Sequence, residues 1–232
     1  MADHRLALII GANRGIGLGV TKEFLARGWD VIATARDPAK AVALQALEAA
    51  HSGRVSIVRL EMTDPAALDG FANSLGSKVV DAVLINAGIS GPEHHSASAA
   101  TAAEIGELMF TNAIAPIRLT RSLVSHVRRD TGVVAFTSSI MGSIAANNGG
   151  HELYRASKAA LNSLARGLWS ELRSRKLTMV SLHPGWVRTD MGGPSAAVSV
   201  EDSARGIVTV IEQQSGAHQH RFLDYQGLEL PW

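Results

Sequence analysis

Short apolar runs alternate along the chain with longer segments in which apolar residues recur at helical spacing. The short runs are rich in β-branched residues, which is typical of strands. They predict seven strands, at Leu6–Ile10, Asp30–Ala35, Val55–Leu60, Val79–Ile85, Gly132–Thr137, Met179–Leu182 and Arg221–Asp224. The helical segments lie between them, near residues 15–27, 39–50, 65–75, 102–128, 152–174 and 199–213. Because strand and helix alternate throughout, we expect an α/β fold with a parallel sheet and, since crossovers are right-handed, helices on both faces.

Composition narrows the class of protein. The chain has 232 residues, of which 46% are hydrophobic and 19% charged, so it can bury the core of one α/β domain spanning residues 1–232. The net charge is +1 and the basic residues are dispersed, which argues against nucleic-acid binding. The absence of cysteine excludes disulfides and thiolate metal sites. The first apolar run is too short for a signal peptide or a membrane span, so we expect a cytoplasmic protein that does not bind membranes.

The nine histidines do not follow a metal-binding pattern. His94, His95, His218 and His220 have no acidic or histidine partners at metal-ligand spacing, so we expect solvated loop residues and no metal site. His151 precedes a predicted helix, and we expect it either to border a substrate or to lie at the surface.

Two segments between predicted elements are rich in Gly, Pro, Ser and Ala: Ile89–Ala103 and Asp190–Val200. Long loops in compact domains tend to be functional, so we expect both to be mobile loops near a site. The alternative is that they are ordinary surface connections.

A glycine-rich turn follows the first predicted strand. It opens a predicted helix and reads Gly11-Ala12-Asn13-Arg14-Gly15-Ile16-Gly17. Glycines let the backbone approach a pyrophosphate closely, and the free N–H groups of the helix start favour an anion. The spacing is G-x-x-x-G-x-G and not the commoner G-x-G-x-x-G, so the turn alone is also compatible with close packing only.

Two arginines favour a phosphorylated adenosine ribose. In nucleotide-binding folds the end of the second strand meets this ribose, where an acid binds the 2′-hydroxyl and an arginine accommodates a 2′-phosphate. Arg36 follows the second strand here, and Arg14 lies inside the glycine turn. We therefore expect NADP(H) as cofactor. The alternative is that Asp37 is the ribose-binding acid of an NAD enzyme and Arg36 is merely solvated.

A serine, a tyrosine and a lysine form a candidate catalytic group. Ser139 follows the fifth strand, at the edge where ligands bind in open α/β sheets. Tyr154 and Lys158 share one face of a predicted helix because they are four residues apart. An ammonium near the phenol should lower the tyrosine pKa toward the working range of a general acid, while Ser139 hydrogen-bonds the substrate oxygen.

These motifs together resemble the short-chain dehydrogenase/reductase family over essentially the whole chain. The turn matches the family's T-G-x-x-x-G-x-G except for Ile10, and Asn86-Ala87-Gly88 matches its N-A-G stretch. The resemblance implies a Rossmann-type, doubly wound sheet in the strand order 3-2-1-4-5-6-7. It also implies a catalytic tetrad, of Asn112, Ser139, Tyr154 and Lys158, with Ser138 as the minor alternative to Ser139.

The resemblance extends the expected cofactor site. Pro184, Gly185, Val187 and Thr189 match a segment that binds the nicotinamide carboxamide, and Glu61-Met62 takes the place of an aspartate-plus-apolar pair beside the adenine. The complete set expected to bind cofactor is Gly11, Asn13, Arg14, Gly15, Ile16, Gly17, Arg36, Glu61, Met62, Asn86, Ala87, Gly88, Tyr154, Lys158, Pro184, Gly185, Val187 and Thr189. In relatives that use NAD the discriminating acid falls at the position of Ala35, and in relatives that use NADP a basic residue follows that position, as Arg36 does here. The resemblance therefore supports NADPH.

The branch most similar to this chain contains small carbonyl reductases and C-factor-like proteins. We therefore expect an NADPH-dependent reductase of an aldehyde or ketone, with Tyr154 as proton donor. The alternatives are an NAD-dependent alcohol dehydrogenase and a nucleotide-binding signalling protein of the same fold. Family members commonly pair through the helices at 102–128 and 152–174, so the resemblance also implies a homodimer or homotetramer.

Overall fold

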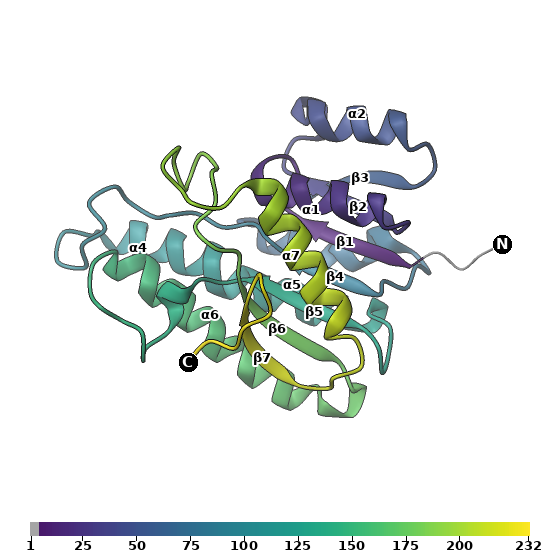
Figure 1. The fold of residues 1–232 in the computed structure, drawn as a ribbon. Helices are drawn as coiled ribbons and strands as arrows, with labels where there is room; N and C mark the ends of the chain where they lie inside the picture. Colours follow the sequence, from purple (N-terminus) through teal and green to yellow (C-terminus); the bar gives the residue numbers. More distant parts are fainter. Residues whose placement is uncertain (1–4) are drawn as a thin grey trace.

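The computed structural model describes residues 5–232, which fold around one parallel sheet (Figure 1). Its strands follow the order β3-β2-β1-β4-β5-β6-β7, and each neighbouring pair is parallel. The strands are β1 (Leu6–Ile10), β2 (Asp30–Ala35), β3 (Val55–Arg59), β4 (Ala82–Ile85), β5 (Val133–Thr137), β6 (Thr178–His183) and β7 (His220–Asp224). The expected Rossmann-type topology is therefore confirmed.

Helices cover both faces of the sheet. One face carries α1 (Gly15–Ala26), α2 (Val42–Ala50) and α7 (Val200–Gln213). The other carries α3 (Pro65–Gly70), α5 (Ala115–Leu123) and α6 (Glu152–Glu171), with α4 (Ala102–Met109) leading into α5 (Figure 1). Short 3-10 turns occupy residues 38–40, 71–75, 124–126, 140–142 and 173–175.

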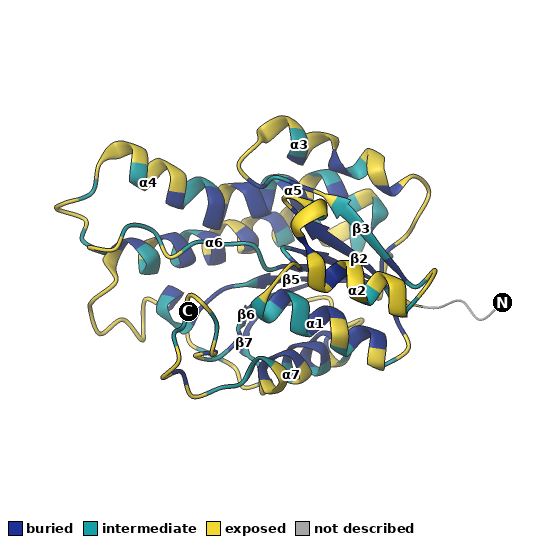
Figure 2. Cartoon of the chain, turned by 90° about the horizontal axis from the view of Figure 1, so that it is seen from above, coloured by how far each residue is buried: buried dark blue, intermediate teal, exposed yellow. Residues whose placement is uncertain are grey.

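The central strands are buried on both sides, which explains their continuous apolar sequence. In β1, Ala7 and Ile9 belong to the core under α1 and α7, whereas Leu8 and Ile10 belong to the core under α5 and α6. All four side chains are inaccessible to solvent. Figure 2 shows this pattern for the whole molecule, with buried strands inside and exposed residues on the outer faces of the helices.

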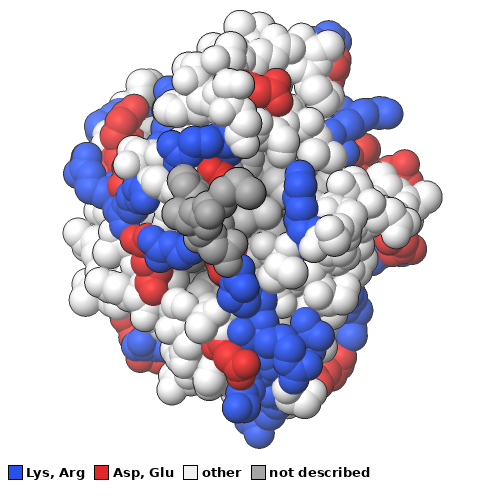
Figure 3. Space-filling view, turned by 90° about the vertical axis from the view of Figure 1, so that its right-hand side faces the viewer, with Lys and Arg blue, Asp and Glu red and all other residues white. Residues whose placement is uncertain are grey.

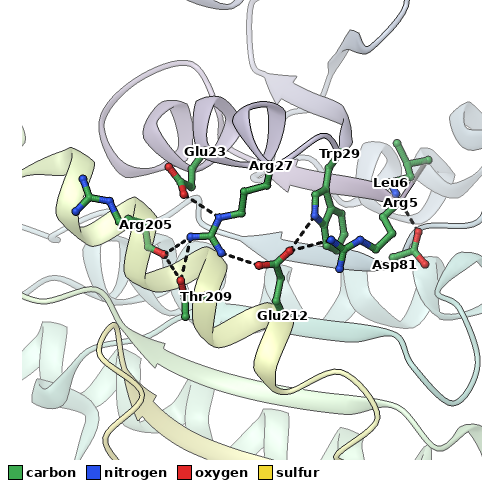
Figure 4. A network of polar contacts seen from close by, with 9 residues as sticks. All are labelled: Arg5, Leu6, Glu23, Arg27, Trp29, Asp81, Arg205, Thr209 and Glu212. Atoms are coloured by element: carbon green, nitrogen blue, oxygen red, sulfur yellow. Dashed lines mark hydrogen bonds and ion pairs between the residues drawn. The ribbon is translucent and has the colours of Figure 1, made fainter. Parts of the chain in front are cut away.

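A polar network holds α7 against the start of the sheet (Figure 4). Glu212 of α7 accepts hydrogen bonds from Arg27 at 2.6 Å, Trp29 at 3.1 Å and Arg5 at 3.1 Å. Arg27 also bonds Glu23 of its own helix. The contacts of Glu212 and Arg27 lie at the amino ends of the strands, which leaves the opposite edge of the sheet for a site.

Acidic and basic side chains are interspersed over the surface on this side of the molecule, although Lys and Arg gather toward the lower end of the view in Figure 3.

The helical segment expected near residues 102–128 is confirmed but is not one regular α-helix. It consists of α4, a π-helical turn at Phe110–Ile114, α5 and a 3-10 turn. The solvated environment expected for His220 is wrong. His220 is not a solvated loop residue, because it begins β7 and is only 4% exposed. Its Nε2 lies 3.1 Å from the Ser181 hydroxyl, and burial lowers its pKa to about 3.

Among residues 5–232, no helix is long and apolar enough to cross a membrane. No group of three or more His, Asp and Glu side chains in the same range is arranged to hold a metal ion.

Candidate active site

The predicted site residues gather at the carboxyl ends of the strands. The glycine turn follows β1, the Asn86-Ala87-Gly88 stretch follows β4, and Ser139 follows β5. Parallel strands end at the same edge of a sheet, so these segments are brought together although they are far apart in the sequence. Helix α6 supplies Tyr154 and Lys158 to the same edge.

The glycine turn packs so tightly that side chains would block it. Gly11 has φ +81°, a conformation that favours glycine. A Cβ added at Gly17 would lie 2.1 Å from the Gly11 carbonyl oxygen. The same oxygen accepts a hydrogen bond of 3.1 Å from the side-chain amide of Asn86, which ties the turn to the end of β4. Asn13 is exposed, and Ile16 packs against the core below.

A threonine outside the set of predicted site residues stabilises this turn. The Gly11 N–H donates to the hydroxyl of Thr34 at 3.0 Å, and the Ala12 N–H donates to the Thr34 carbonyl at 2.9 Å. Thr34 lies on β2 and is 1% exposed. It gives the turn a hydroxyl acceptor from the neighbouring strand, although Ile10 replaces the threonine of the family motif.

Arg14 joins the glycine turn to the segment after β6. Its guanidinium forms an ion pair with Asp190, and both side chains are well exposed. A Cβ added at Gly15 would lie 3.3 Å from Thr189, which brings the two segments together at a second point. Thr189 in turn accepts a hydrogen bond from the Gly192 N–H at 3.1 Å. Asp190 is therefore a further residue of the site, in one of the two segments expected near it.

The rest of the segment after β6 is anchored to α7 and to itself. The Pro184 carbonyl accepts a hydrogen bond of 2.7 Å from Ser203 of α7. Gly185 has φ +84°, and a Cβ there would lie 3.0 Å from Val198. Val187 is 4% exposed and pairs with Val198 in an isolated bridge. These contacts hold the segment beside the glycine turn.

The residue that follows the end of β2 is a cation, Arg36. Arg36 is 81% exposed on its side chain, and its nearest acidic group is Glu61 at 3.8 Å. Arg59, at the end of β3, donates to the Arg36 carbonyl at 3.4 Å and adds a second guanidinium nearby. Asp37 caps the following turn through the Ala39 N–H and pairs with Lys40 at 3.4 Å. Its carboxylate is thus already engaged, which argues against a ribose-binding role.

The two residues expected beside the adenine, Glu61 and Met62, lie in different environments. Glu61 accepts hydrogen bonds from the Thr63 N–H at 3.1 Å and the Thr63 hydroxyl at 2.9 Å. Met62 is 7% exposed and belongs to the core under α5 and α6. Only Glu61 of the two therefore has an accessible side chain at the sheet edge.

Tyr154 and Lys158 lie together in a largely buried setting. The Lys158 ammonium is 5.7 Å from the centre of the Tyr154 ring and donates to the Thr137 carbonyl at 2.8 Å. Burial raises the pKa of Tyr154 to about 12, an effect that a hydrogen bond with Ser139 opposes. Burial lowers the pKa of Lys158 to about 8. Without a cofactor, burial therefore outweighs the lowering of the tyrosine pKa expected from the sequence.

The two neighbouring serines have different environments. Ser138 is 1% exposed, and its hydroxyl donates to Asn162 of α6 at 2.7 Å. Ser139 is 8% exposed and lies beside Tyr154, while its hydroxyl accepts the Met141 N–H at 3.1 Å. Of the two, only Ser139 has a hydrogen bond with the Tyr154 hydroxyl.

Asn112 lies in the π-helical turn, within reach of the lysine. Its amide donates to Ser157 at 3.0 Å and to the Ile89 carbonyl at 2.8 Å. A Cβ added at Gly88 would lie 3.2 Å from Asn112 Oδ1 and 3.5 Å from Lys158 Nζ, so the three residues adjoin. The α-helical donor to the Asn112 carbonyl would be the N–H of residue 116, and Pro116 has none. Single π turns of this kind frequently occur at functional sites.

Comparisons with known proteins agree with this geometry. Residues 5–198 match the model of the short chain dehydrogenase family. The C-signal protein of Myxococcus xanthus is 42% identical over 164 residues, which cover 70% of this chain and 98% of that protein. A carbonyl reductase from Pseudomonas aeruginosa PAO1 in complex with NADP superposes with a TM-score of 0.92 at 43% identity, covering 99% of this chain and 100% of that one. The NADPH-bound carbonyl reductase from chicken fatty liver has a TM-score of 0.87 at 34% identity, with 99% of both chains covered. The chain therefore belongs to the short-chain dehydrogenase family of oxidoreductases.

Proposed function

We propose that the chain is an NADPH-dependent reductase of aldehydes or ketones. The observation that carries the proposal is the convergence of Ser139, Tyr154 and Lys158 beside the glycine turn, at one edge of the sheet. Solved relatives that bind NADP and are carbonyl reductases support the same reaction.

The residues present fit NADP(H). The contact between Gly17 and the Gly11 carbonyl keeps the turn free of side chains, so that its N–H groups can receive a pyrophosphate. The exposed guanidinium of Arg36 suits a 2′-phosphate. Arg14 adds a second cation once it exchanges Asp190 for phosphate, because an ion pair between two exposed side chains contributes little stability. Thr189 lies against Gly15 of the turn, and the bridge between Val187 and Val198 holds the same segment, which supports their proposed contact with the nicotinamide carboxamide.

The chain's own residues would supply the proton and stabilise the developing charge. Bound NADPH provides the hydride that adds to the carbonyl carbon. The Tyr154 phenol donates its proton to the carbonyl oxygen, and the Ser139 hydroxyl hydrogen-bonds that oxygen as it becomes negative. The Lys158 ammonium stabilises the phenolate that remains. The Asn112 carbonyl lacks its α-helical hydrogen-bond donor. It can therefore accept another hydrogen bond, on the path by which a proton returns to Lys158.

The experiment that tests this function measures NADPH consumption with a chemically diverse panel of aldehydes and ketones. Oxidation of NADPH that depends on a carbonyl compound, with the corresponding alcohol as product, is expected. A nucleotide-binding signalling protein is the second candidate, favoured by the similarity to C-signal. NADPH binding without turnover of any compound in the panel would favour that candidate.

The rate of reduction should fall as the pH rises through about 8. Burial lowers the pKa of Lys158 to about 8, so its ammonium is mostly protonated at neutral pH and is lost above that value. The Tyr154 phenol keeps its proton over the same range, because its pKa is raised to about 12. A profile of kcat/KM against pH should therefore show one alkaline limb near pH 8. A profile that stays level well beyond that pH would contradict the role of Lys158.

Thr34→Val should weaken NADPH binding about tenfold, because the Gly11 N–H loses its hydroxyl acceptor at a buried position. Thr34→Ser keeps the hydroxyl and serves as the matched control, with affinity close to that of the original protein. The measurement is NADPH binding by fluorescence, together with kcat at saturating cofactor, which should change little. Equal affinity of the valine and serine variants would show that the hydroxyl does not position the turn.

We also propose that the chain forms a homodimer through α4 and α6, the pairing implied by the family. Ile105 and Ile114, on and just after α4, and Leu164 of α6 are large apolar residues that remain exposed in the single chain.

A further inference from the structure

Two histidines from separate parts of the chain stack at the start of α6. The ring centroids of His95 and His151 are 4.3 Å apart, and the ring planes are inclined at 52°. His95 lies between β4 and α4, whereas His151 is the N-cap residue of α6, three residues before Tyr154. A solvated His95 is expected from the sequence, but the structure half-buries it and leaves its Nδ1 buried without a hydrogen-bond partner. This contact joins a loop to the helix that carries the proposed proton donor.

Both histidines have left-handed backbones, with φ 55° at His95 and 48° at His151. This conformation is unfavourable for residues other than glycine, and it persists where surrounding contacts determine it, commonly at functional sites. A second contact reinforces the first, because the carboxylate of Glu152 accepts a hydrogen bond of 2.7 Å from the Ala97 N–H. The loop is therefore held to the first turn of α6 by adjacent residues of that helix.

The loop is anchored near both ends of the stretch of α6 that carries Tyr154. It begins at Gly88, which adjoins Lys158 Nζ, and the Asn112 side chain bonds both the N–H and the carbonyl of Ile89. It ends near His151 at the opposite end of the same helical face. Tyr154 lies between Lys158 and His151 along α6, so the two anchors of the loop are on either side of Tyr154 along this helix. Figure 1 shows this long connection between β4 and α4 at the left of the molecule.

We propose that the His95–His151 pair determines which carbonyl substrates the site accepts, by fixing residues 89–101 as one wall of the pocket beside Tyr154. The inference rests on the proposed reductase function. The two rings are positioning residues: they set the space next to the phenol and take no part in proton transfer. When the pair is broken, the wall moves away from α6, so a small carbonyl compound is held less well and a bulky one gains room.

The test is a double-mutant cycle with His95→Asn, His151→Asn and the double variant. Asparagine tolerates the left-handed backbone, so these variants remove the rings with little added backbone strain. His218→Asn is the matched control, because His218 also has a left-handed backbone, with φ 55°, but precedes β7 at the other edge of the sheet. KM and kcat are measured for a short aliphatic aldehyde and for a bulky aryl ketone, and NADPH affinity is measured separately.

Each single variant should raise KM for the short aldehyde about fivefold to tenfold, shift kcat/KM toward the aryl ketone, and leave NADPH affinity and kcat for the aldehyde unchanged. The double variant should match the singles, because the rings act as one unit. Unchanged KM values, additive effects, or the same change in His218→Asn would overturn the proposal.

A readout independent of turnover separates this proposal from the reductase function. Hydrogen exchange of the NADPH complex should increase in residues 89–101 of His151→Asn and remain unchanged in the rest of the sheet edge. If the original protein reduces no carbonyl compound, the proposed function fails, and this exchange measurement still decides whether the histidine pair holds the loop. Unchanged exchange in residues 89–101 would overturn the pair's role.

Discussion

Tyr154→Phe is expected to lower kcat/KM for carbonyl reduction by about 10²–10⁴-fold and to leave NADPH affinity unchanged. The variant keeps the ring that packs near Lys158 but loses the hydroxyl that, in the proposed mechanism, gives its proton to the substrate oxygen. Steady-state kinetics followed by NADPH absorbance measure the loss of turnover, and fluorescence titration measures the affinity.

Tyr225→Phe is the matched control, because the chain has only two tyrosines. The Tyr225 ring packs near Gly185, and the proposed mechanism gives its hydroxyl no role. This variant should retain the activity of the original protein. Full activity in Tyr154→Phe, or an equal loss in Tyr225→Phe, would refute the assignment of Tyr154 as proton donor.

Tyr154→Phe should lower the rate of reduction by more than it would if the Tyr154 hydroxyl only stabilised charge on the substrate oxygen. Burial raises the pKa of Tyr154 to about 12, so the phenol carries its proton at neutral pH and is ready to act as an acid. Alcohol oxidation would require the same group to lose that proton first. The charges of Lys158 and of an oxidised nicotinamide must then overcome the cost of burial. At neutral pH the phenol is therefore in the protonated form that the proposed reduction requires.

The strands could be predicted closely because those of a parallel sheet covered on both faces are apolar without interruption. The predicted bounds of β1 and β2 match the structure residue for residue. The fourth strand is predicted to begin at Val79, but β4 begins at Ala82. The reason is that Val80 pairs with Val127 only in an isolated bridge. Apolar character continues there although the regular strand does not.

Hydrophobic periodicity does not predict the π turn within residues 102–128, for a different reason. A π turn adds one residue to a single turn, while apolar side chains before and after it still face the same core. Pro116 was a visible signal, since its missing N–H removes one helical bond, to the carbonyl of Asn112. The spacing of apolar residues does not reflect a missing backbone N–H, so it predicts an unbroken helix.

Contacts between distant segments could not be predicted from a single sequence. The Thr34 hydroxyl meets the Gly11 N–H only because β2 lies next to β1 in the observed register. Asp190 meets Arg14 because the segment after β6 folds toward the glycine turn. Motifs identified the residues with a chemical role, whereas the residues that hold them in place depend on tertiary structure.

Arg36→Ala is expected to weaken NADPH binding about tenfold and to leave NADH binding unchanged. A hydrogen bond to a charged group contributes about 1.5–3 kcal/mol, and the lower end applies because the Arg36 side chain is 81% exposed. Arg14→Ala combined with Arg36→Ala should weaken NADPH binding further, because a second guanidinium is lost. Titrations of both cofactors at two ionic strengths measure the effect, since salt screens exposed charges.

Arg173→Ala is the control for this prediction, because it removes the same charge from the turn after α6, away from the end of β2. Its affinity for both cofactors should equal that of the original protein. NADH binding at least as tight as NADPH binding, or an unchanged preference in Arg36→Ala, would favour an NAD-dependent alcohol dehydrogenase instead. That outcome would require another group for the ribose hydroxyls, since Asp37 already caps its own turn and Ala35 is buried. A loss of NADPH affinity in Arg36→Ala that is smaller than expected would point to Arg59 as a further contact of the 2′-phosphate, because its guanidinium adjoins the Arg36 backbone.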